Sequence, residues 1–479
     1  MQSMRILLVN PPVGFSYGIL GISRPPLGLA YIAAAIRDRF DVEIVDFNVE
    51  ETDWRQFPYD HYDIVGISVD TARCPIAFGI AEVAKQHKTT VVVGGPHVSF
   101  LDQEALQTGY IDYVVRNEGE YSFRSLVEYL DGSLPFEEVR GVSYLDGGKC
   151  RRTPNAPFIA DLDSLPFPAR DLLHLDRYKE RMNGRPMTTL TTSRGCPFNC
   201  EFCSASQFSG VKWRARSVEN VIAEVEVLYE KYGYRALSFV DDNFTLNPAR
   251  AIAISEEILR RGWDLIWAAM TRVDTIVRHP ELVSIMARSG FSWTFIGFES
   301  GTQETLDKYG KKATIGEALK AMEILKANKV QVTGAFILGE LHETPQMVRQ
   351  TINFAKRLDP RRAQFSILTP YPGTRLFTQV EDRLLTRNWE LYSGMYPTIR
   401  LDHMSPRRLR RLFLSAYREF YGRPRKALQN FEYIMRVLPS IPRMVAPAIG
   451  TMAAGYSRRP INYARKCLAT VGRFLTLKT

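Results

Sequence analysis

The chain has 479 residues, a length that suggests about two to four domains. Its composition of 45% hydrophobic and 24% charged residues is typical of a globular protein and excludes an intrinsically disordered chain. The net charge of +10 is concentrated at one end, because residues 403–479 contain 16 Lys and Arg against two Glu.

Residues 1–150 predict a doubly wound parallel sheet, because apolar runs rich in Val and Ile alternate with segments of helical length. The expected strands cover residues 5–9, 42–47, 63–68, 90–95 and 112–120, and the expected helices cover residues 27–39, 75–87, 102–108 and 120–131. Such sheets bind ligands outside the carboxyl ends of their strands, where glycine lets the backbone approach. Ser68, Thr71, Gly94 and Gly95 lie at two of these ends and are candidate cofactor-binding residues.

A proline-rich segment follows, and we expect residues 151–185 to form a linker. A second alternation then predicts a partial TIM-type (β/α)6 barrel over residues 186–402. Its expected strands cover residues 188–193, 236–242, 264–270, 293–299, 332–339 and 363–370.

Residues 403–479 predict a basic helical C-terminal region. Its apolar residues follow helical spacing, from Leu409 and Leu412 to Phe420 and Tyr421, while arginines occupy the other faces. One interpretation is attachment to an anionic membrane surface, where each basic side chain contributes about 1 kcal/mol. The alternative is a helical cap on the barrel with a solvated basic face.

The sequence shows neither a signal peptide nor a membrane span. The N-terminus lacks a long apolar region with a cleavage site, and the weakly polar stretch at residues 444–455 is much shorter than the roughly 20 residues that cross a bilayer. We therefore expect a cytoplasmic protein, which the tail would hold at the inner face of the membrane if it binds lipid.

Half of the six cysteines are clustered. Cys196, Cys200 and Cys203 follow the first expected barrel strand, at the end where barrel enzymes carry their chemistry. Thiolates at this density indicate zinc or an iron-sulfur cluster. A 4Fe-4S cluster with three cysteine ligands leaves one iron open, as in a catalytic metal site. A zinc knuckle and a purely structural cluster are the alternatives.

With Phe202, these cysteines form the pattern C-x3-C-x-aromatic-C, and the chain here resembles the radical S-adenosylmethionine (SAM) superfamily. The resemblance continues, in the order of that family, through FVDDNF (239–244), IGFESG (296–301) and GAFILGELHET (334–344). It implies a 4Fe-4S cluster and SAM as cofactors, with reductive cleavage of SAM to a 5′-deoxyadenosyl radical. The electron would come from an external flavodoxin- or ferredoxin-like donor.

The same resemblance implies roles for single residues. Phe202 would contact the adenine, Asp241 or Asp242 the methionine amine, and Glu299 the ribose. The acidic residues could instead be caps at strand ends. Glu340, Leu341 and His342 depart from the common Gly-Leu-Pro-Gly-Glu-Thr form, so the resemblance implies no role for them.

The first 150 residues resemble the cobalamin-binding domain that precedes the barrel in one subfamily. The segments that carry this resemblance are NPPVGF (10–15), SRPPLGLAYIAAAI (23–36), GISVDT (66–71), VGGPH (93–97) and RNEGE (116–120). Pro12 replaces the histidine that ligates cobalt from below in the D-x-H-x-x-G motif. Either cobalamin binds without that ligand, or the sheet is kept for packing alone. We expect Cys74 to be an ordinary buried residue, and a position below the cobalt is the alternative.

The layout of the whole chain is similar to enzymes of lipid, hopanoid and bacteriochlorophyll synthesis, including the anaerobic magnesium-protoporphyrin monomethyl ester cyclase. The resemblance implies methylation of an unactivated carbon of a small hydrophobic metabolite, such as a lipid, isoprenoid or tetrapyrrole. Radical oxidative cyclisation or rearrangement is the alternative in the same site, and a non-catalytic cobalamin or iron-sulfur carrier is the alternative of another class. We do not expect nucleic acid as a partner, because the chain lacks the second set of cysteines of a tRNA methylthiotransferase.

Overall fold

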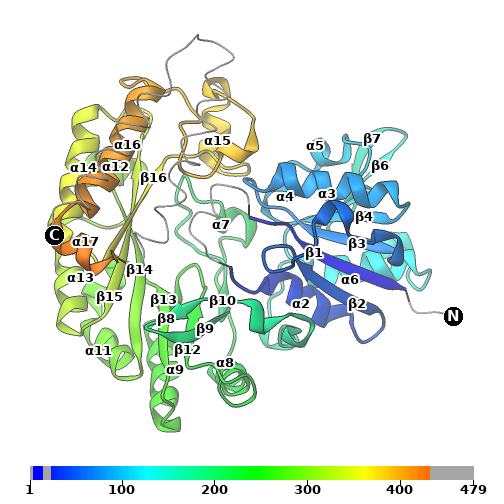
Figure 1. The fold of residues 1–479 in the computed structure, drawn as a ribbon, viewed down its shortest axis with the longest axis horizontal. Helices are drawn as coiled ribbons and strands as arrows, with labels where there is room; N and C mark the ends of the chain where they lie inside the picture. Colours follow the sequence, from blue (N-terminus) through cyan, green and yellow to red (C-terminus); the bar gives the residue numbers. More distant parts are fainter. Residues whose placement is uncertain (1–3, 14–22, 432–479) are drawn as a thin grey trace, which may run out of the picture.

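The computed structural model describes residues 4–13 and 23–431 of the chain. Figure 1 shows two α/β units side by side, a smaller one in blue and cyan and a larger one in green to orange. Each unit contains a seven-stranded sheet, so the fold is of the class that the alternating pattern predicts.

The first sheet is parallel over five strands and ends in an antiparallel hairpin, in the order β2-β1-β3-β4-β5-β6-β7. Its strands are β1 (Arg5–Asn10), β2 (Asp41–Asp46), β3 (Ile64–Ser68), β4 (Thr90–Gly94), β5 (Tyr113–Val115), β6 (Val142–Asp146) and β7 (Lys149–Arg152). The strand order reverses between β1 and β3, and such a switch point opens a crevice at the carboxyl ends of the strands.

Helices cover both faces of this sheet, as the doubly wound pattern requires. They are α2 (Leu27–Ile36), α3 (Cys74–Gln86), α4 (Pro96–Phe100), α5 (Asp102–Leu106) and α6 (Gly119–Leu130). Helices α2 and α6 pack on one face, where Ala33 and Phe123 meet Ile6, and α3 packs on the other, where Ile80 meets Val65. The expected strand at 112–120 ends at Val115, because α6 begins within the same segment.

The expected linker runs along the seam between the two units as short turns. Its 3-10 turns cover Leu162–Ser164, Arg170–Leu172 and Leu175–Arg177. Within it, the Ala169 amide donates to the carbonyl of Ala30 in α2, and Arg37 of α2 pairs with Asp171 at 2.7 Å. The segment is therefore bound closely to the first unit.

Six parallel strands and one antiparallel strand form the sheet of the second unit, in the order β16-β15-β14-β13-β12-β9-β8. Its strands are β8 (Arg181–Met182), β9 (Arg185–Leu190), β12 (Ala236–Phe239), β13 (Ile266–Met270), β14 (Phe291–Glu299), β15 (Gln331–Leu338) and β16 (Arg362–Ile367). Within the described residues β16 does not pair with β8 or β9, so the sheet is a partial barrel, as the sequence predicts.

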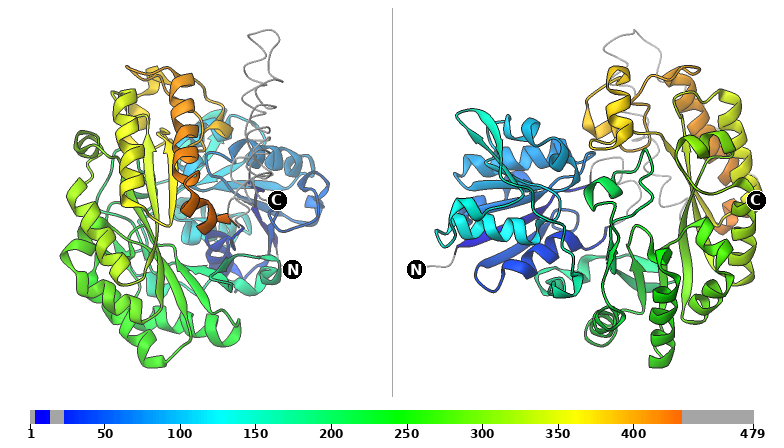
Figure 2. Two further views of the ribbon diagram at one scale, coloured as in Figure 1. Left: turned by 60° about the vertical axis from the view of Figure 1, so that its left-hand side comes forward. Right: turned by 180° about the vertical axis from the view of Figure 1, so that it is seen from behind.

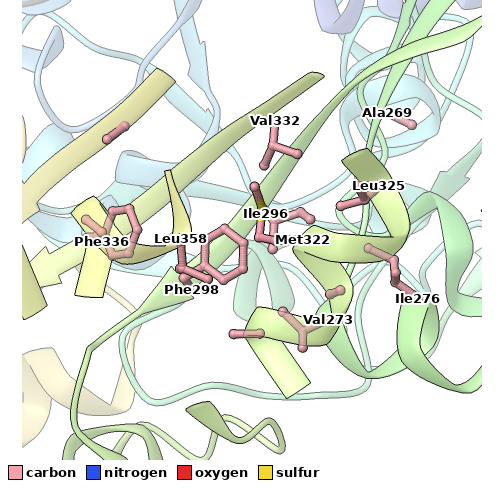
Figure 3. Packing of buried hydrophobic residues seen from close by; sticks show 14 of the residues in the cluster. Ala269, Val273, Ile276, Ile296, Phe298, Met322, Leu325, Val332, Phe336 and Leu358 are labelled. Carbon is pink, nitrogen blue, oxygen red and sulfur yellow. The ribbon is translucent and has the colours of Figure 1, made fainter. Parts of the chain in front are cut away.

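Helices surround the outside of this sheet and bury one side of each strand. They are α8 (Val218–Glu226), α9 (Pro248–Arg261), α10 (Val273–Arg278), α11 (Pro280–Arg288), α12 (Gln303–Lys308), α13 (Ile315–Ala327) and α14 (Pro345–Leu358). The short helix α7 (Ala205–Phe208) instead lies between the two units in Figure 1, and α15 (Arg375–Gln379) follows the last strand. Figure 3 shows the resulting core, in which Ile296 of β14 and Val332 of β15 meet Met322 of α13. Alternate residues of β15 are buried in this core, which leaves the others to line the barrel interior.

Helix α16 (Pro406–Tyr421) lies beside α14 on the outside of the barrel (Figure 2, left) and is followed by α17 (Pro424–Gln429). Its apolar side, which includes Leu409, Phe413 and Phe420, is buried in the barrel core. This part of the tail is the helical cap, and its apolar side is covered by protein. Residues 444–455 and Cys467 lie outside the described residues. Within residues 4–13 and 23–431, no helix is long and apolar enough to cross a membrane.

Candidate active site

The three cysteines lie in a loop whose two ends are paired with each other. Strands β10 (Ser193–Arg194) and β11 (Arg214–Ala215) form an antiparallel ribbon, and residues 195–213 run between them. Cys196, Cys200 and Cys203 are half-buried free thiols on this loop, near the carboxyl end of β9. The structure therefore brings the predicted metal ligands to one loop at the mouth of the barrel.

The donor set of this loop fits an iron-sulfur cluster better than a single zinc ion. Among the described residues, no three Cys, His, Asp or Glu side chains converge on one metal position. A closed structural zinc site has four protein ligands, whereas residues 195–213 offer three cysteines and no histidine, which is the ligand set of a 4Fe-4S cluster with one open iron. Burial raises the pKa of the Cys203 thiol to about 11, so binding a cluster must release its proton.

Asp241 and Asp242 follow β12 and face different surroundings. Asp241 is 1% exposed and accepts hydrogen bonds from the Thr192 amide at 2.6 Å and from the hydroxyls of Thr192 and Ser193 at 2.5 and 2.6 Å. Its carboxylate therefore fixes the backbone that leads into the cysteine loop. Asp242 instead lines a cavity of about 780 Å³, and burial raises its pKa to about 6. The structure thus places Asp242, and not Asp241, where a ligand could reach it.

Glu299 ends β14 in a left-handed conformation with φ of 61°. Its carboxylate accepts a hydrogen bond from the Lys311 ammonium at 2.6 Å, and both side chains are about nine-tenths buried. A Cβ at Gly297 would lie 2.9 Å from the Lys311 nitrogen, so only glycine leaves room for this ion pair. Lys311 was not predicted from the sequence, since no motif marks it. Phe202 packs against Tyr309 nearby in the core, with ring centroids 4.9 Å apart.

A cavity of about 780 Å³ lies between the carboxyl edge of the first sheet and the ribbon that carries the cysteine loop. The first unit contributes Ser68, Gly94 and Gly95, and the barrel unit contributes Ser193, Arg194, Asp242 and Gln364. Thr71, Asp241, Phe202 and Glu299 are not among its lining residues. Ser68, Gly94, Gly95 and Asp242 therefore line this cavity, whereas the other predicted residues, including Cys196, Cys200 and Cys203, do not.

Part of the cavity wall in the first unit is an apolar slot, against which apolar atoms of a ligand could pack. Leu8, Ile32, Val92 and Phe123 line this slot. A Cβ at Gly66 would lie 2.9 Å from a methyl of Leu8 and 3.4 Å from the Phe123 ring, so glycine keeps the slot open.

The loop that lacks the expected histidine is held by Arg73, which the sequence analysis did not identify. Its guanidinium donates to Asp70 at 2.5 Å, to the Asn10 side-chain oxygen at 2.9 Å and to the Pro11 carbonyl at 3.1 Å. Cys74 is 1% exposed within the core of the first unit and does not line the cavity. It is therefore an ordinary buried residue in this structure.

Comparisons with known proteins agree with this division into two cofactor-binding units. Residues 190–355 match the Radical SAM superfamily, and residues 21–127 match the B12 binding domain. An uncharacterized methyltransferase of Pyrococcus horikoshii is 39% identical over 445 residues, which cover 90% of this chain and 96% of the relative. The anaerobic magnesium-protoporphyrin IX monomethyl ester cyclase of Rubrivivax gelatinosus is 28% identical over 431 residues, or 87% of this chain and 77% of the cyclase.

Among solved structures, the fold is similar to the cobalamin-dependent SAM radical enzyme OxsB with aqua-cobalamin and SAM bound. The TM-score is 0.65 at 24% sequence identity. The matched region covers 75% of this chain and 52% of OxsB, so this chain spans about half the length of that enzyme. The similarity extends across both units of the fold.

Proposed function

We propose that this chain, which belongs to the radical SAM enzymes with an N-terminal B12-binding domain, methylates an unactivated carbon of a small hydrophobic metabolite. Its cofactors are a 4Fe-4S cluster, SAM and cobalamin. An external electron donor and the metabolite are the partners that this function requires.

The observation that carries the proposal is that both units line one cavity. Gly94 and Gly95 of the first unit and Asp242 of the barrel unit border the same space of about 780 Å³. A methyl donor held by the first unit and a radical source held by the second can therefore act on one substrate.

The residues of this chain would hold the cofactors as follows. Cys196, Cys200 and Cys203 would bind the cluster and leave one iron for SAM. Asp242 would accept a hydrogen bond from the methionine ammonium, because its carboxylate lines the cavity beside the cysteine loop. The cofactors together supply a carbon radical on the substrate and a methyl group to combine with it.

The barrel interior offers apolar side chains to such a substrate, beside polar ones such as Thr333 of β15 and Gln364 of β16. Met270 of β13, Phe295 of β14 and Ile337 of β15 are not fully buried in the outer core and alternate with residues that are. The Rubrivivax relative is a magnesium-protoporphyrin IX monomethyl ester cyclase, which supports a tetrapyrrole-sized substrate and also favours oxidative cyclisation as the second candidate function.

A peripheral position at an anionic membrane is a further part of the proposal. Arg407, Arg408, Arg411 and Arg418 are exposed on α16, and such side chains are attracted to anionic lipid. An apolar substrate would partition into the same membrane.

The function is tested by anaerobic reconstitution with iron, sulfide, cobalamin and reductant. We expect nearly four iron atoms and one cobalt per chain, cleavage of SAM, and loss of both iron and cleavage in Cys200→Ala. Cys150→Ala is the matched control, since Cys150 is also a half-buried free thiol but lies on the distant strand β7. Unchanged iron in Cys200→Ala would contradict the cluster assignment.

The product distinguishes the two candidate functions once a lipid or tetrapyrrole substrate is supplied. Methylation adds one methylene to the product mass and releases S-adenosylhomocysteine, whereas cyclisation or rearrangement releases 5′-deoxyadenosine alone.

A further inference from the structure

Both ends of the cysteine loop are held by carboxylates of the first unit. Arg194, at the start of the loop, donates to Glu118 at 3.1 Å and to Glu120 at 2.6 Å. Arg214, at the end of the loop, donates to both oxygens of Glu118 at 2.8 Å. We call these four side chains the Glu118 joint.

The Glu118 joint also makes hydrogen bonds to the linker. The second oxygen of Glu118 accepts a hydrogen bond from the Ile159 amide at 2.7 Å, and Arg214 donates to the Ile159 carbonyl at 2.7 Å. Glu118 therefore connects the first unit, to which it belongs, with both the linker and the ribbon of the cysteine loop.

The Glu118 joint is buried and electrically balanced. The side chains of Glu118, Glu120 and Arg214 are 8%, 5% and 5% exposed, and two guanidinium groups face two carboxylates. The rings of Tyr31 and Phe158 lie 5.3 and 5.0 Å from the guanidinium carbons of Arg194 and Arg214. Removing one partner of a buried ion pair leaves an uncompensated charge, so the four groups hold one another in a fixed arrangement.

The Glu118 joint forms part of the cavity wall. Glu118, Glu120 and Arg194 are among the lining residues of the 780 Å³ cavity. A ligand in the cavity would displace water from this side of the ion pairs, and charges attract more strongly when water is excluded. A bound ligand would therefore tighten the hold on both ends of the cysteine loop.

We propose that the Glu118 joint couples cobalamin binding in the first unit to retention of the iron-sulfur cluster in the second. Its four members are positioning residues, since they act through the loop that carries the cysteines. The inference rests on the proposed function and adds a thermodynamic link between its two cofactor sites. Coupling of this kind is reciprocal, so a loaded cluster must raise the affinity for cobalamin by the factor by which cobalamin raises the affinity for the cluster.

Two measurements on the full chain test the coupling. The first is the Kd for hydroxocobalamin, titrated by absorbance with and without the cluster, and we expect the cluster to lower it about five-fold or more. The second is the rate at which a ferrous chelator removes iron under argon, which cobalamin should slow, although reciprocity fixes the factor only for affinities and not for rates.

Glu120→Gln is the preferred variant, because Arg194 keeps Glu118 as a partner and the chain should still fold. We expect this variant to bind both cofactors. The ratio of its Kd for hydroxocobalamin without the cluster to that with the cluster should fall close to one. Asp102→Asn is the matched control. Asp102 is a buried carboxylate of the first unit that pairs with Arg152 at 2.7 Å, also in the first unit, and is 2% exposed. Asp102→Asn should lose stability but keep the wild-type ratio of the hydroxocobalamin Kd values. Arg194→Lys should keep part of the coupling.

The outcomes separate the two proposals. Independent binding of the two cofactors in the wild type would overturn the coupling and leave the proposed function intact. The same holds if Glu120→Gln keeps the wild-type ratio of Kd values, or if Asp102→Asn loses as much of that ratio as Glu120→Gln does. Failure of the wild-type chain to bind cobalamin or a cluster would overturn both proposals.

Discussion

At the scale of single residues, two adjacent aspartates have different tasks because they point to different surroundings. Asp241 accepts three hydrogen bonds from Thr192 and Ser193, whereas Asp242 lines the cavity. Burial first, and then the Asp241 carboxylate, raise the pKa of Asp242 to about 6. Asp242 is therefore the aspartate that we expect to contact the ammonium group of a bound ligand.

We predict that binding of S-adenosylhomocysteine weakens in the wild type between pH 7.5 and pH 5.5. Protonation of Asp242 below about pH 6 removes the negative charge that attracts the ligand ammonium. Asp242→Asn should bind about ten-fold to a hundred-fold more weakly at pH 7.5, with little dependence on pH. Calorimetric titration at the two pH values measures both effects.

Thermal unfolding gives a second, independent readout of the same residue. The pKa of Asp242 is higher in the folded chain than the value of about 3.9 in the unfolded chain. Stability is therefore lost as pH rises from about 4 through 6. Asp242→Asn should melt above the wild type at pH 7.5 and close to it near pH 4. The control Asp264→Asn, at a carboxylate that is 75% exposed, should match the wild type in ligand affinity.

At the residue scale, the sequence could predict a site only where spacing along the chain carries the chemistry. The three cysteines lie on one loop because they are neighbours in sequence. Lys311 could not be found in this way, since its contact with Glu299 depends on the irregular register between β14 and β15 and on the space left by Gly297. The choice between Asp241 and Asp242 also needed the structure, because adjacent residues differ only in direction.

At the scale of structural elements, the β10–β11 ribbon holds the cysteine loop in shape, and Gly195 is its most constrained residue. Gly195 has φ of 85°, and a Cβ there would lie 2.5 Å from the Lys212 carbonyl oxygen and 2.8 Å from that of Gly210. Any side chain must push the first and last residues of the loop apart. The shape of the loop therefore depends on this glycine.

We predict that Gly195→Ala lowers the iron content after reconstitution by more than half while the protein remains folded. Gly184→Ala is the matched control, because Gly184 has φ of 80° but nothing lies within 4 Å of its added Cβ. Both variants pay the left-handed strain of about 1–2 kcal/mol, so only the backbone contact differs between them. Equal iron content in the two variants would show that the loop tolerates the change.

Sequence patterns predicted the buried elements better than the exposed ones. The helical spacing of Leu409, Leu412 and Phe413 identified the buried side of α16, because burial on one face imposes that period. The β6–β7 hairpin gave no such signal. It lies at the edge of the sheet, where strand β7 is mostly charged and exposed. Pairing with a neighbour, rather than burial, makes these residues strands.

At the scale of the whole molecule, contacts between residues that are distant in sequence hold the two units together. The Glu118 joint is one such set of contacts, and its partners are up to 96 residues apart in sequence. Elsewhere the Trp389 indole donates to Glu104 at 3.0 Å, across 285 residues. No local pattern predicts such pairs, so the sequence could give the two units but not the seam between them.

The tail also has to be considered at this scale, because α16 covers the barrel core and cannot also be an apolar membrane anchor. Deleting residues 403–479 would expose the barrel core that α16 covers, so the truncation should instead end at Phe431.

Residues 432–479 contain eight Lys and Arg and one Glu. We predict that the full chain binds vesicles of anionic lipid and that the truncated chain binds them several-fold more weakly. In both cases binding should weaken between about 50 and 500 mM salt, because screening shortens the reach of the surface charges. Co-sedimentation with anionic and neutral vesicles measures this. Equal binding by the two chains would assign the attraction to the arginines of α16, and no binding by either would exclude the membrane.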